Sequence, residues 1–349
     1  MRGAVIAPTA RDDIKPSTKE TSIKTKPLFT IVKSTLAVIA LACAFVSTGG
    51  RAAAGDMTTS GTGADAKGTT APATPSEEPK IHFLLQNEFS DKYITPRGLI
   101  VEDKGVVWQP LGVMLIDLYS KDSGFLTDVT LAPANWASVH SHRAGPQNRN
   151  WNEDDPSIAL NLTFYKDLEL DSTYTAFVSE NGAYPTSTNL DEKLTYHDNF
   201  IPGGFSINPY VEYFDELTNK ATFNLVPATS KRGYYFVLGV DPKYTVKTAW
   251  EPITFELPTF VSVVSDHFYQ RKDGSPGGSG VGVFSSEFKA SIPLDFVPKG
   301  YGHWTAYAGF QYYYIANHGA LDGNSVFGAS APDRNHDLYQ FHTGIQIFF

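Results

Sequence analysis

Polar and apolar residues alternate along most of the chain beyond residue 80. The alternation is clearest over residues 301–317, where Trp304 and Phe310 share one parity and Thr305 and Gln311 share the other. Successive side chains of a β-strand point to opposite faces, so this pattern predicts strands with one apolar and one polar face. Turn-rich connections separate twelve such segments, and we predict a strand in each: 81–93, 107–120, 123–137, 156–168, 171–184, 192–202, 205–218, 232–246, 251–269, 281–294, 301–317 and 336–349.

The last segment ends the chain on an aromatic residue. It contains a polar residue, a glycine, an apolar residue and a terminal aromatic at a spacing filled by His342, Gly344, Ile347 and Phe349. This spacing resembles the C-terminal insertion signal of outer-membrane β-barrel proteins. The resemblance implies two partners, namely outer-membrane lipid and the barrel assembly machinery, which would act through the C-terminal strand.

The segments together predict an all-β fold, a 12-stranded antiparallel transmembrane up-and-down β-barrel over residues 80–349. Long and short connections alternate between the predicted strands, as expected for long external loops and short periplasmic turns. An even number of strands places both ends of the barrel on the periplasmic side. A secreted β-sandwich also alternates, but its apolar faces are mainly aliphatic. Here Tyr, Trp and Phe are common near the strand ends, which favours a barrel with aromatic girdles.

The N-terminal residues have the order of a secretory signal peptide. A basic stretch precedes an apolar run over residues 34–46, and the small residues Ala52, Ala53 and Ala54 follow it. We predict a signal peptide over residues 1–54. The alternative is an uncleaved inner-membrane anchor, but the run is shorter than the roughly 20 residues that a spanning helix needs. The single cysteine, Cys43, lies within the run, so the exported chain would form no internal disulfide.

Residues 55–79 consist almost entirely of small, polar and charged residues, so we expect a flexible periplasmic linker. The whole chain has 28 Lys and Arg against 37 Asp and Glu, a net charge of −9. Residues 1–54 are basic on balance, so their removal makes the rest more acidic still. A chain of this charge is not expected to bind nucleic acid. We expect localisation in the bacterial outer membrane after export.

Several short motifs resemble one family of bacterial barrels. Ser90, Tyr93, Arg97 and Gly98, followed by Gln109-Pro110, resemble the first hairpin of the TorF-type porins of Gram-negative bacteria. Tyr184-Pro185 and Gly233-Tyr234-Tyr235 are similar in order and spacing. Pro96 departs from the family pattern, and the connection between the third and fourth predicted strands is longer than the pattern expects. The resemblance implies a small outer-membrane barrel of the porin class with no established substrate, and it supplies no catalytic residues.

The parity of the predicted strands places charged side chains inside the barrel. The nine candidates for the lumen lining are Glu212, Asp241, Lys243, Glu256, Asp266, Glu287, Lys289, His303 and His342. Twelve strands lie between the small barrels that side chains fill and the larger ones that hold open channels. The candidates therefore line a water-filled pathway with a mild preference for cations, or they pair across the lumen and plug it.

The function that this pattern favours is a porin-like channel for passive diffusion of small polar solutes or ions. The alternative is a non-conducting barrel with a structural or surface-interaction role. An enzyme is not expected. A barrel phospholipase would need serine and histidine on its lipid-facing side, where Ser265 and His267 are the only close candidate pair, and the sequence shows no third residue to orient them. The histidines show no metal-ligand spacing, so neither a metal site nor a cofactor is predicted.

Overall fold

The computed structural model describes residues 80–198, 204–220, 231–271, 273–327 and 335–349. The predicted signal peptide and the predicted linker lie outside the described residues. In the described part of the chain, no helix is both long and apolar enough to cross a membrane.

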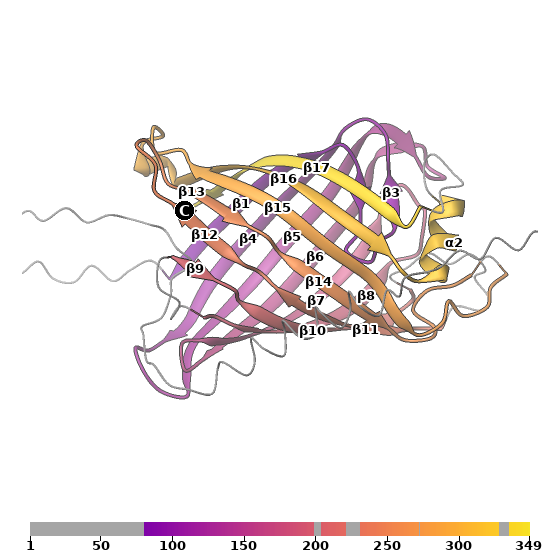
Figure 1. The fold of residues 1–349 in the computed structure, drawn as a ribbon, viewed down its shortest axis with the longest axis horizontal. Coiled ribbons are helices and arrows are strands. Elements are labelled where there is room, and N and C mark those ends of the chain that lie inside the picture. The colour runs from indigo at the N-terminus through magenta and orange to yellow at the C-terminus, as the bar shows by residue number, and fades with distance from the viewer. Residues whose placement is uncertain (1–79, 199–203, 221–230, 272, 328–334) are drawn as a thin grey trace, which may run out of the picture. The chain divides into compact units, whose positions relative to one another are not determined.

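Twelve antiparallel strands form a closed transmembrane β-barrel (Figure 1). β1 pairs with β17 from Leu84 opposite Phe348 to Ser90 opposite His342, and this pairing closes the wall. The predicted fold class is therefore confirmed. In order around the wall, the strands are β1 (Ile81–Ser90), β4 (Val107–Ser120), β5 (Leu126–Ala144), β6 (Arg149–Phe164), β7 (Leu168–Ser179), β8 (Ser187–Tyr196), β10 (Pro209–Thr218), β11 (Tyr234–Val240), β14 (Thr259–Val264), β15 (Gly280–Pro293), β16 (His303–Ile315) and β17 (Asp337–Phe348).

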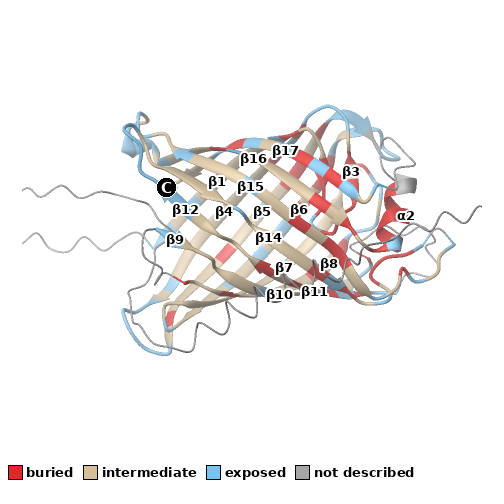
Figure 2. Cartoon of the chain, viewed as in Figure 1, coloured by how far each residue is buried: buried red, intermediate tan, exposed pale blue. Residues whose placement is uncertain are grey.

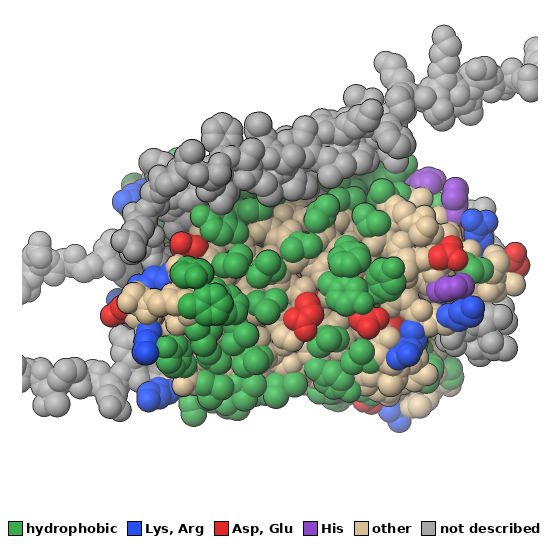
Figure 3. All heavy atoms as spheres, turned by 90° about the horizontal axis from the view of Figure 1, so that it is seen from below, with side chains coloured by type: hydrophobic (Ala, Val, Ile, Leu, Met, Phe, Trp, Pro, Cys, Tyr) green, Lys and Arg blue, Asp and Glu red, His purple; other side chains and the backbone are tan. Residues whose placement is uncertain are grey.

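The wall has an apolar outer face and a polar inner face. On the outer face, Phe341 of β17 and Phe288 of β15 are 58% and 53% exposed, whereas Gln340 and Ser285 on the opposite parity are buried. Hydrophobic side chains are spread over the wall visible in Figure 3, whereas Lys and Arg side chains gather toward its two ends and His side chains toward one of them. The outer face of such a wall can contact lipid hydrocarbon, and its inner face can contact a polar interior. Pairing between the strands satisfies the backbone N–H and C=O groups.

One predicted loop is wrong. The sequence pattern placed residues 138–155 in a connection, but β5 and β6 continue through this region and pair from Ser138 opposite Glu153 to Ala144 opposite Arg149. The run Asn152 to Asp155 is polar on both faces, so it carries no alternation signal, yet ladder hydrogen bonds need only backbone groups. The connection that remains between β5 and β6 is a tight turn.

Two predicted strands are interrupted by prolines. The segment predicted over 232–246 is divided into β11 and β12 (Lys243–Val246) at Pro242, and the segment over 251–269 is divided into β13 (Ile253–Glu256) and β14 at Pro258. Proline has no N–H to donate to the ladder, which explains both breaks. β12 and β13 form a hairpin that, with β9 (Phe205–Ser206), extends the wall next to β15.

Short elements lie at both ends of the barrel. The connection between β1 and β4 contains β2 (Tyr93–Ile94) and β3 (Ile100–Glu102), and α2 (His318–Phe327) lies between β16 and β17. Figure 1 places β3 and α2 at one end, which we call the loop end, and Phe349 at the other, the terminal end, where the helical turn η2 (Lys299–Tyr301) joins β15 to β16. Buried residues gather toward the loop end (Figure 2).

Candidate functional site

The connection of residues 91–106 folds into the barrel at the loop end, and we call it the inserted loop. Ile94, Leu99 and Ile100 are only 3–4% exposed. They belong to one hydrophobic cluster with residues of β10, β11, β14, β15, β16 and β17, together with Phe268, Tyr269 and Leu321. An apolar layer therefore crosses the lumen at the loop end, because the loop packs against strands on several sides of the wall.

A tight turn at Gly98 lets the inserted loop reverse inside the lumen. The Gly98 N–H donates to the Thr95 carbonyl at 2.8 Å, and the Thr95 N–H donates to the Leu99 carbonyl at 2.9 Å. Gly98 has φ of +76°, and a Cβ at this position would overlap Ile315 Cδ1 and lie 2.7 Å from Val283 Cγ2. Glycine is the residue that adopts this backbone conformation without steric cost.

Hydrogen bonds from distant parts of the chain hold the inserted loop. The Ile100 N–H donates to Asn324 Oδ1 of α2 at 2.9 Å, and Asn324 Nδ2 donates to the Gly98 carbonyl at 3.0 Å. The Tyr93 hydroxyl donates to Glu153 Oε2 of β6 at 2.8 Å, and the Tyr269 hydroxyl donates to the Arg97 carbonyl at 2.5 Å. The loop is therefore tied to several regions of the barrel, and these bonds satisfy backbone groups of Arg97, Gly98 and Ile100 that would otherwise be buried without a partner.

Arg97 extends from the tip of the inserted loop to aromatic rings of the barrel wall. Its guanidinium carbon lies 4.8 Å from the centroid of the Phe177 ring on β7 and 5.8 Å from that of Phe214 on β10. The side chain is buried, at 9% exposure. A cation over aromatic faces is stabilised by the ring quadrupoles, so Arg97 fixes the tip of the loop against β7 and β10.

A second contact fastens the C-terminal side of the inserted loop. Glu102 Oε2 lies 3.6 Å from His140 Nδ1 of β5, and Glu102 Oε1 accepts hydrogen bonds from the backbone N–H groups of Asp103 and Lys104, each at 3.0 Å. Burial pushes the pKa of the Glu102 carboxyl upward, but the hydrogen bond to His140 and the two backbone N–H groups outweigh burial and leave the pKa below its ordinary value. The ionised carboxylate is therefore the form that the folded loop favours.

Some predicted lumen residues form a charged cluster near the middle of the wall. His342 Nδ1 of β17 lies 3.2 Å from Glu88 Oε2 of β1, and His342 Nε2 lies 3.0 Å from Glu287 Oε1 of β15. The Tyr307 hydroxyl of β16 donates to the same Glu88 oxygen at 3.0 Å. Glycine at position 309 opposite His342 makes room for the imidazole between the two carboxylates, since a Cβ there would overlap Nε2.

A second predicted group meets toward the terminal end. Lys243 Nζ of β12 lies 3.2 Å from Asp241 Oδ2 and 3.1 Å from Glu256 Oε1 of β13. Lys289 Nζ of β15 forms an ion pair with the other Glu256 oxygen. Two lysines and two carboxylates thus balance in charge at this level, so this group adds no net charge to the lumen.

The remaining predicted residues lie apart. Glu212 of β10 accepts a hydrogen bond from the Tyr235 hydroxyl at 3.4 Å and lies opposite Lys193 in the strand register. His303 begins β16 and is exposed at the terminal end. Asp266 follows β14 in a turn of the loop end, with a side chain that is 58% exposed and 4.0 Å from His267. The structure does not bring Asp266 or His303 into contact with the clusters above, because both lie where the strands begin or end.

The residues of the predicted insertion signal occupy the edge that closes the barrel. Ile347 lies opposite Leu85 of β1, and the Phe349 N–H donates to the Phe83 carbonyl at 2.9 Å. A Cβ at Gly344 would overlap the Tyr307 hydroxyl, so glycine allows that ring to lie against β17.

Sequence reasoning missed an acidic region of the inner face on β6, β7 and β8. The register places Glu153, Asp155, Glu169, Asp171 and Asp191 on the same face as Glu212. Glu153 and Asp155 were missed because the polar run was assigned to a loop. Their parity is that of Ser157, so extending the alternation of β6 backward would have found them.

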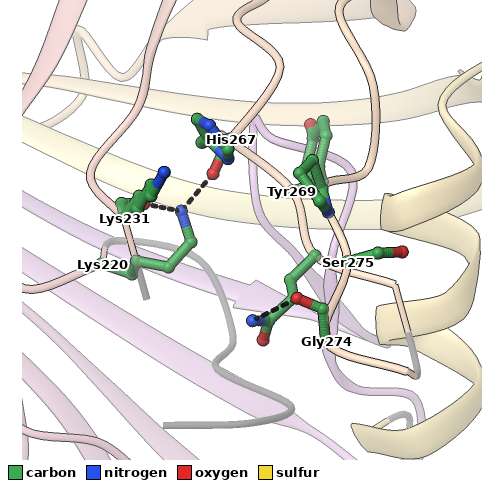
Figure 4. Close-up of a pocket in the computed structure, with 8 residues that line it drawn as sticks. Lys220, Lys231, His267, Tyr269, Gly274 and Ser275 are labelled. Carbon is green, nitrogen blue, oxygen red and sulfur yellow. Dashed lines mark hydrogen bonds between the residues drawn. The ribbon is translucent and has the colours of Figure 1, made fainter. Parts of the chain in front are cut away.

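A cavity of about 240 Å³ opens among the loops of the loop end. Within it, Lys220 Nζ points toward the carbonyl oxygens of Lys231 and His267 (Figure 4), at 2.8 Å and 2.5 Å. It also lies 3.4 Å from Glu216 Oε2. Burial lowers the pKa of Lys220, and the Glu216 carboxylate opposes that shift. The ammonium group joins two connections, so we assign it a structural role.

The candidate enzyme pair does not form a nucleophilic site of the usual geometry. Ser265 Oγ accepts a hydrogen bond from the Tyr234 N–H at 2.9 Å, and the His267 imidazole faces Asp266. The serine oxygen is thus engaged by the backbone of β11, whereas a nucleophile is activated by a hydrogen bond to its base.

The sequence matches no protein-family model and no curated protein sequence. Among solved structures, the chain is similar to the NanC porin, with 9% identity, coverage of 76% of this chain and 98% of that one, and a TM-score of 0.41. It is similar to a bacterial polysaccharide outer-membrane secretin at 8% identity, 77% and 97% coverage and a TM-score of 0.41. An outer-membrane channel from Pseudomonas putida F1 gives 10% identity, 80% and 100% coverage and a TM-score of 0.40. At these identities and TM-scores, the similarities do not extend the description of the fold, which rests on the strand pairing. They also assign no function to this chain.

Proposed function

We propose that this chain is a porin-like channel of the bacterial outer membrane that passes small polar solutes or ions, prefers cations and is restricted by the inserted loop. The observation that carries this proposal is the charge of the inner face. The acidic side chains of the inner face outnumber the basic ones. The acidic residues are Glu88, Glu153, Asp155, Glu169, Asp171, Asp191, Glu212, Asp241, Glu256 and Glu287, and the basic residues are Arg97, Lys193, Lys243, Lys289 and His342. A surplus of carboxylates along a pathway raises the local concentration of cations.

The orientation in the membrane follows from the strand count. Both ends of the barrel lie at the terminal end, which we assign to the periplasm, so the inserted loop and α2 face the exterior. The predicted signal peptide and the C-terminal spacing of His342, Gly344, Ile347 and Phe349 support export and assembly in the outer membrane, with the assembly machinery and outer-membrane lipid as partners. The motif resemblance to the TorF-type porins agrees with this proposal.

A non-conducting barrel is the second candidate. The apolar layer formed by Ile94, Leu99 and Ile100 favours it, because a closed layer of this kind excludes water and ions. In that case, the barrel would have a structural or surface-interaction role. The two candidates differ in whether the inserted loop leaves a pathway or seals one.

Recordings in planar bilayers under a KCl gradient distinguish these functions. The channel proposal expects conductance above leak and a reversal potential with the sign of the K⁺ gradient. Replacing Glu88 and Glu287 by Gln should move that potential toward zero, whereas Asp266→Asn, at an exposed turn of the loop end, should leave it unchanged. Anion selectivity, or folded protein with no conductance above leak, would contradict the proposal.

A further inference from the structure

A cavity of about 350 Å³ lies between the inserted loop and the inner wall, and we call it the lumen cavity. Its volume is within the range of small-molecule sites. Residues of β1, β4, β5, β6, β7, β16 and β17 line it together with Tyr93, Ile94, Pro96 and Arg97 of the loop. The wall and the loop therefore contribute to one concave site.

Two buried polar atoms at this cavity, one a hydrogen-bond donor and the other an acceptor, lack a hydrogen-bond partner among the described residues. Arg97 Nε, a donor, and Asp155 Oδ1, an acceptor, are both buried without a partner among the described residues. Their side chains line the cavity and are only 9% and 8% exposed. Buried polar groups are nearly always hydrogen-bonded, so an orphaned donor and an orphaned acceptor in one cavity indicate a ligand that supplies both.

The rest of the lining is mainly aromatic and amide-rich, and it includes Glu88, whose carboxyl group is already engaged by Tyr307 and His342. Tyr93, Trp136, Phe177 and Tyr313 contribute ring surface, and the Tyr93 and Trp136 rings lie 5.5 Å apart at a tilt of 54°. Gln109 and Gln311 add planar amides, which can both donate and accept. The ligand should therefore present C–H groups to the rings and several hydroxyls at its edges.

The two orphaned atoms discriminate among ligand classes. An ammonium group would satisfy Asp155 Oδ1 but leave Arg97 Nε without an acceptor, and an anion would do the reverse. A hydroxyl group donates and accepts, so adjacent hydroxyls serve both atoms. A small amino acid has both charges but lacks the C–H surface to cover the aromatic rings.

We propose that the lumen cavity binds a neutral sugar of monosaccharide size. This inference deepens the proposed function by naming a solute class, and it rests on that function only for the route by which the sugar arrives. Binding is measured apart from conduction, so either proposal can fail without the other.

The test is isothermal titration of the purified protein in detergent micelles with glucose and with galactose. We expect saturable binding of at least one of them, with Kd on the order of 1 mM, as for a small polar ligand. Asp155→Asn should weaken binding about tenfold, because it replaces a carboxyl group with two acceptor oxygens by an amide with only one. Asp171→Asn is the matched control: it neutralises another orphaned acid of the inner face that lies outside the cavity lining, and it should leave Kd unchanged.

Trp136→Ala provides a second variant, and it should weaken binding by removing ring surface while Asp155 stays in place. Heat-dependent migration on gels establishes that each variant is folded. Folded wild-type protein that binds neither sugar would overturn the inference. Equal losses in Asp155→Asn and Asp171→Asn, or saturable binding of alanine or tetramethylammonium in place of the sugars, would overturn it as well.

Discussion

Gly98 shows how one residue sets the position of the inserted loop. Its positive φ turns the chain back toward the wall, and the absence of a side chain lets the backbone lie against Ile315 and Val283. In the sequence, Gly98 stood out only as part of a motif that resembles the first hairpin of one porin family. The close packing could not be predicted, because Val283 and Ile315 lie far away along the chain.

Gly98→Ala should loosen the inserted loop. The left-handed backbone costs an alanine about 1–2 kcal/mol, and overpacking against Ile315 and Val283 adds about 1–3 kcal/mol. We expect trypsin to cleave after Arg97 faster than in the wild type, as measured by mass spectrometry. Gly204→Ala is the matched control, since Gly204 has the same φ of +76° but no atom within 4 Å of an added Cβ. Unchanged protection of Arg97 in Gly98→Ala would show that the loop is not held by this contact.

Glu102 should make the loop sensitive to acid. The pKa of its carboxyl is lowered in the folded protein, so its stabilisation is fully present above the unfolded-state pKa and is lost as pH falls through the folded-state value. Glu102→Gln should therefore be less stable than the wild type at neutral pH, and the gap should close below the ordinary glutamate pKa of about 4.3. Urea unfolding in lipid vesicles measures the gap. A gap that stays constant between neutral pH and pH about 3 would rule out an ionised Glu102 as its cause.

Among the elements, strand segments in which apolar and polar residues alternate cleanly could be predicted from the sequence with their inward and outward faces. β16 and β17 alternate cleanly, because hydrocarbon selects Phe310 and Phe341 on one face while the lumen selects Gln311 and Gln340 on the other. The part of β6 that carries Glu153 does not alternate, so the sequence predicted neither its pairing register nor the inward orientation of its acidic side chains. The inserted loop depends on hydrogen bonds to α2, β6 and the connection after β14, and such distant contacts leave no local pattern.

The closing strand should depend on its last aromatic residue. Phe349→Ala removes the terminal side chain of the proposed insertion signal, so we expect less folded protein in the outer membrane, as measured by heat-dependent migration of membrane fractions. Phe288→Ala is the control, because Phe288 is also an exposed aromatic of the outer face, at 53% against 48% for Phe349, but lies on β15. Equal yields of the two variants would mean that the terminal position has no special part in assembly.

The whole barrel combines a wall that closes through strand pairing with an inserted loop that is held by side chains. Hydrogen bonds of the ladders complete the ring from β1 to β17, whereas the loop adds an apolar layer at one end and Arg97 at its tip. Removal of the loop should therefore leave the wall intact. The acidic inner face would then be open to ions along its length.

Single-channel conductance of a loop-replacement variant tests whether the inserted loop restricts a cation-selective pathway through the barrel. We would replace residues 93–102 by a short Gly-Ser linker, establish folding by heat-dependent migration, and compare single-channel conductance with the wild type in KCl. We expect a severalfold larger conductance that remains cation-selective. A folded variant that conducts no better than the wild type would contradict this expectation.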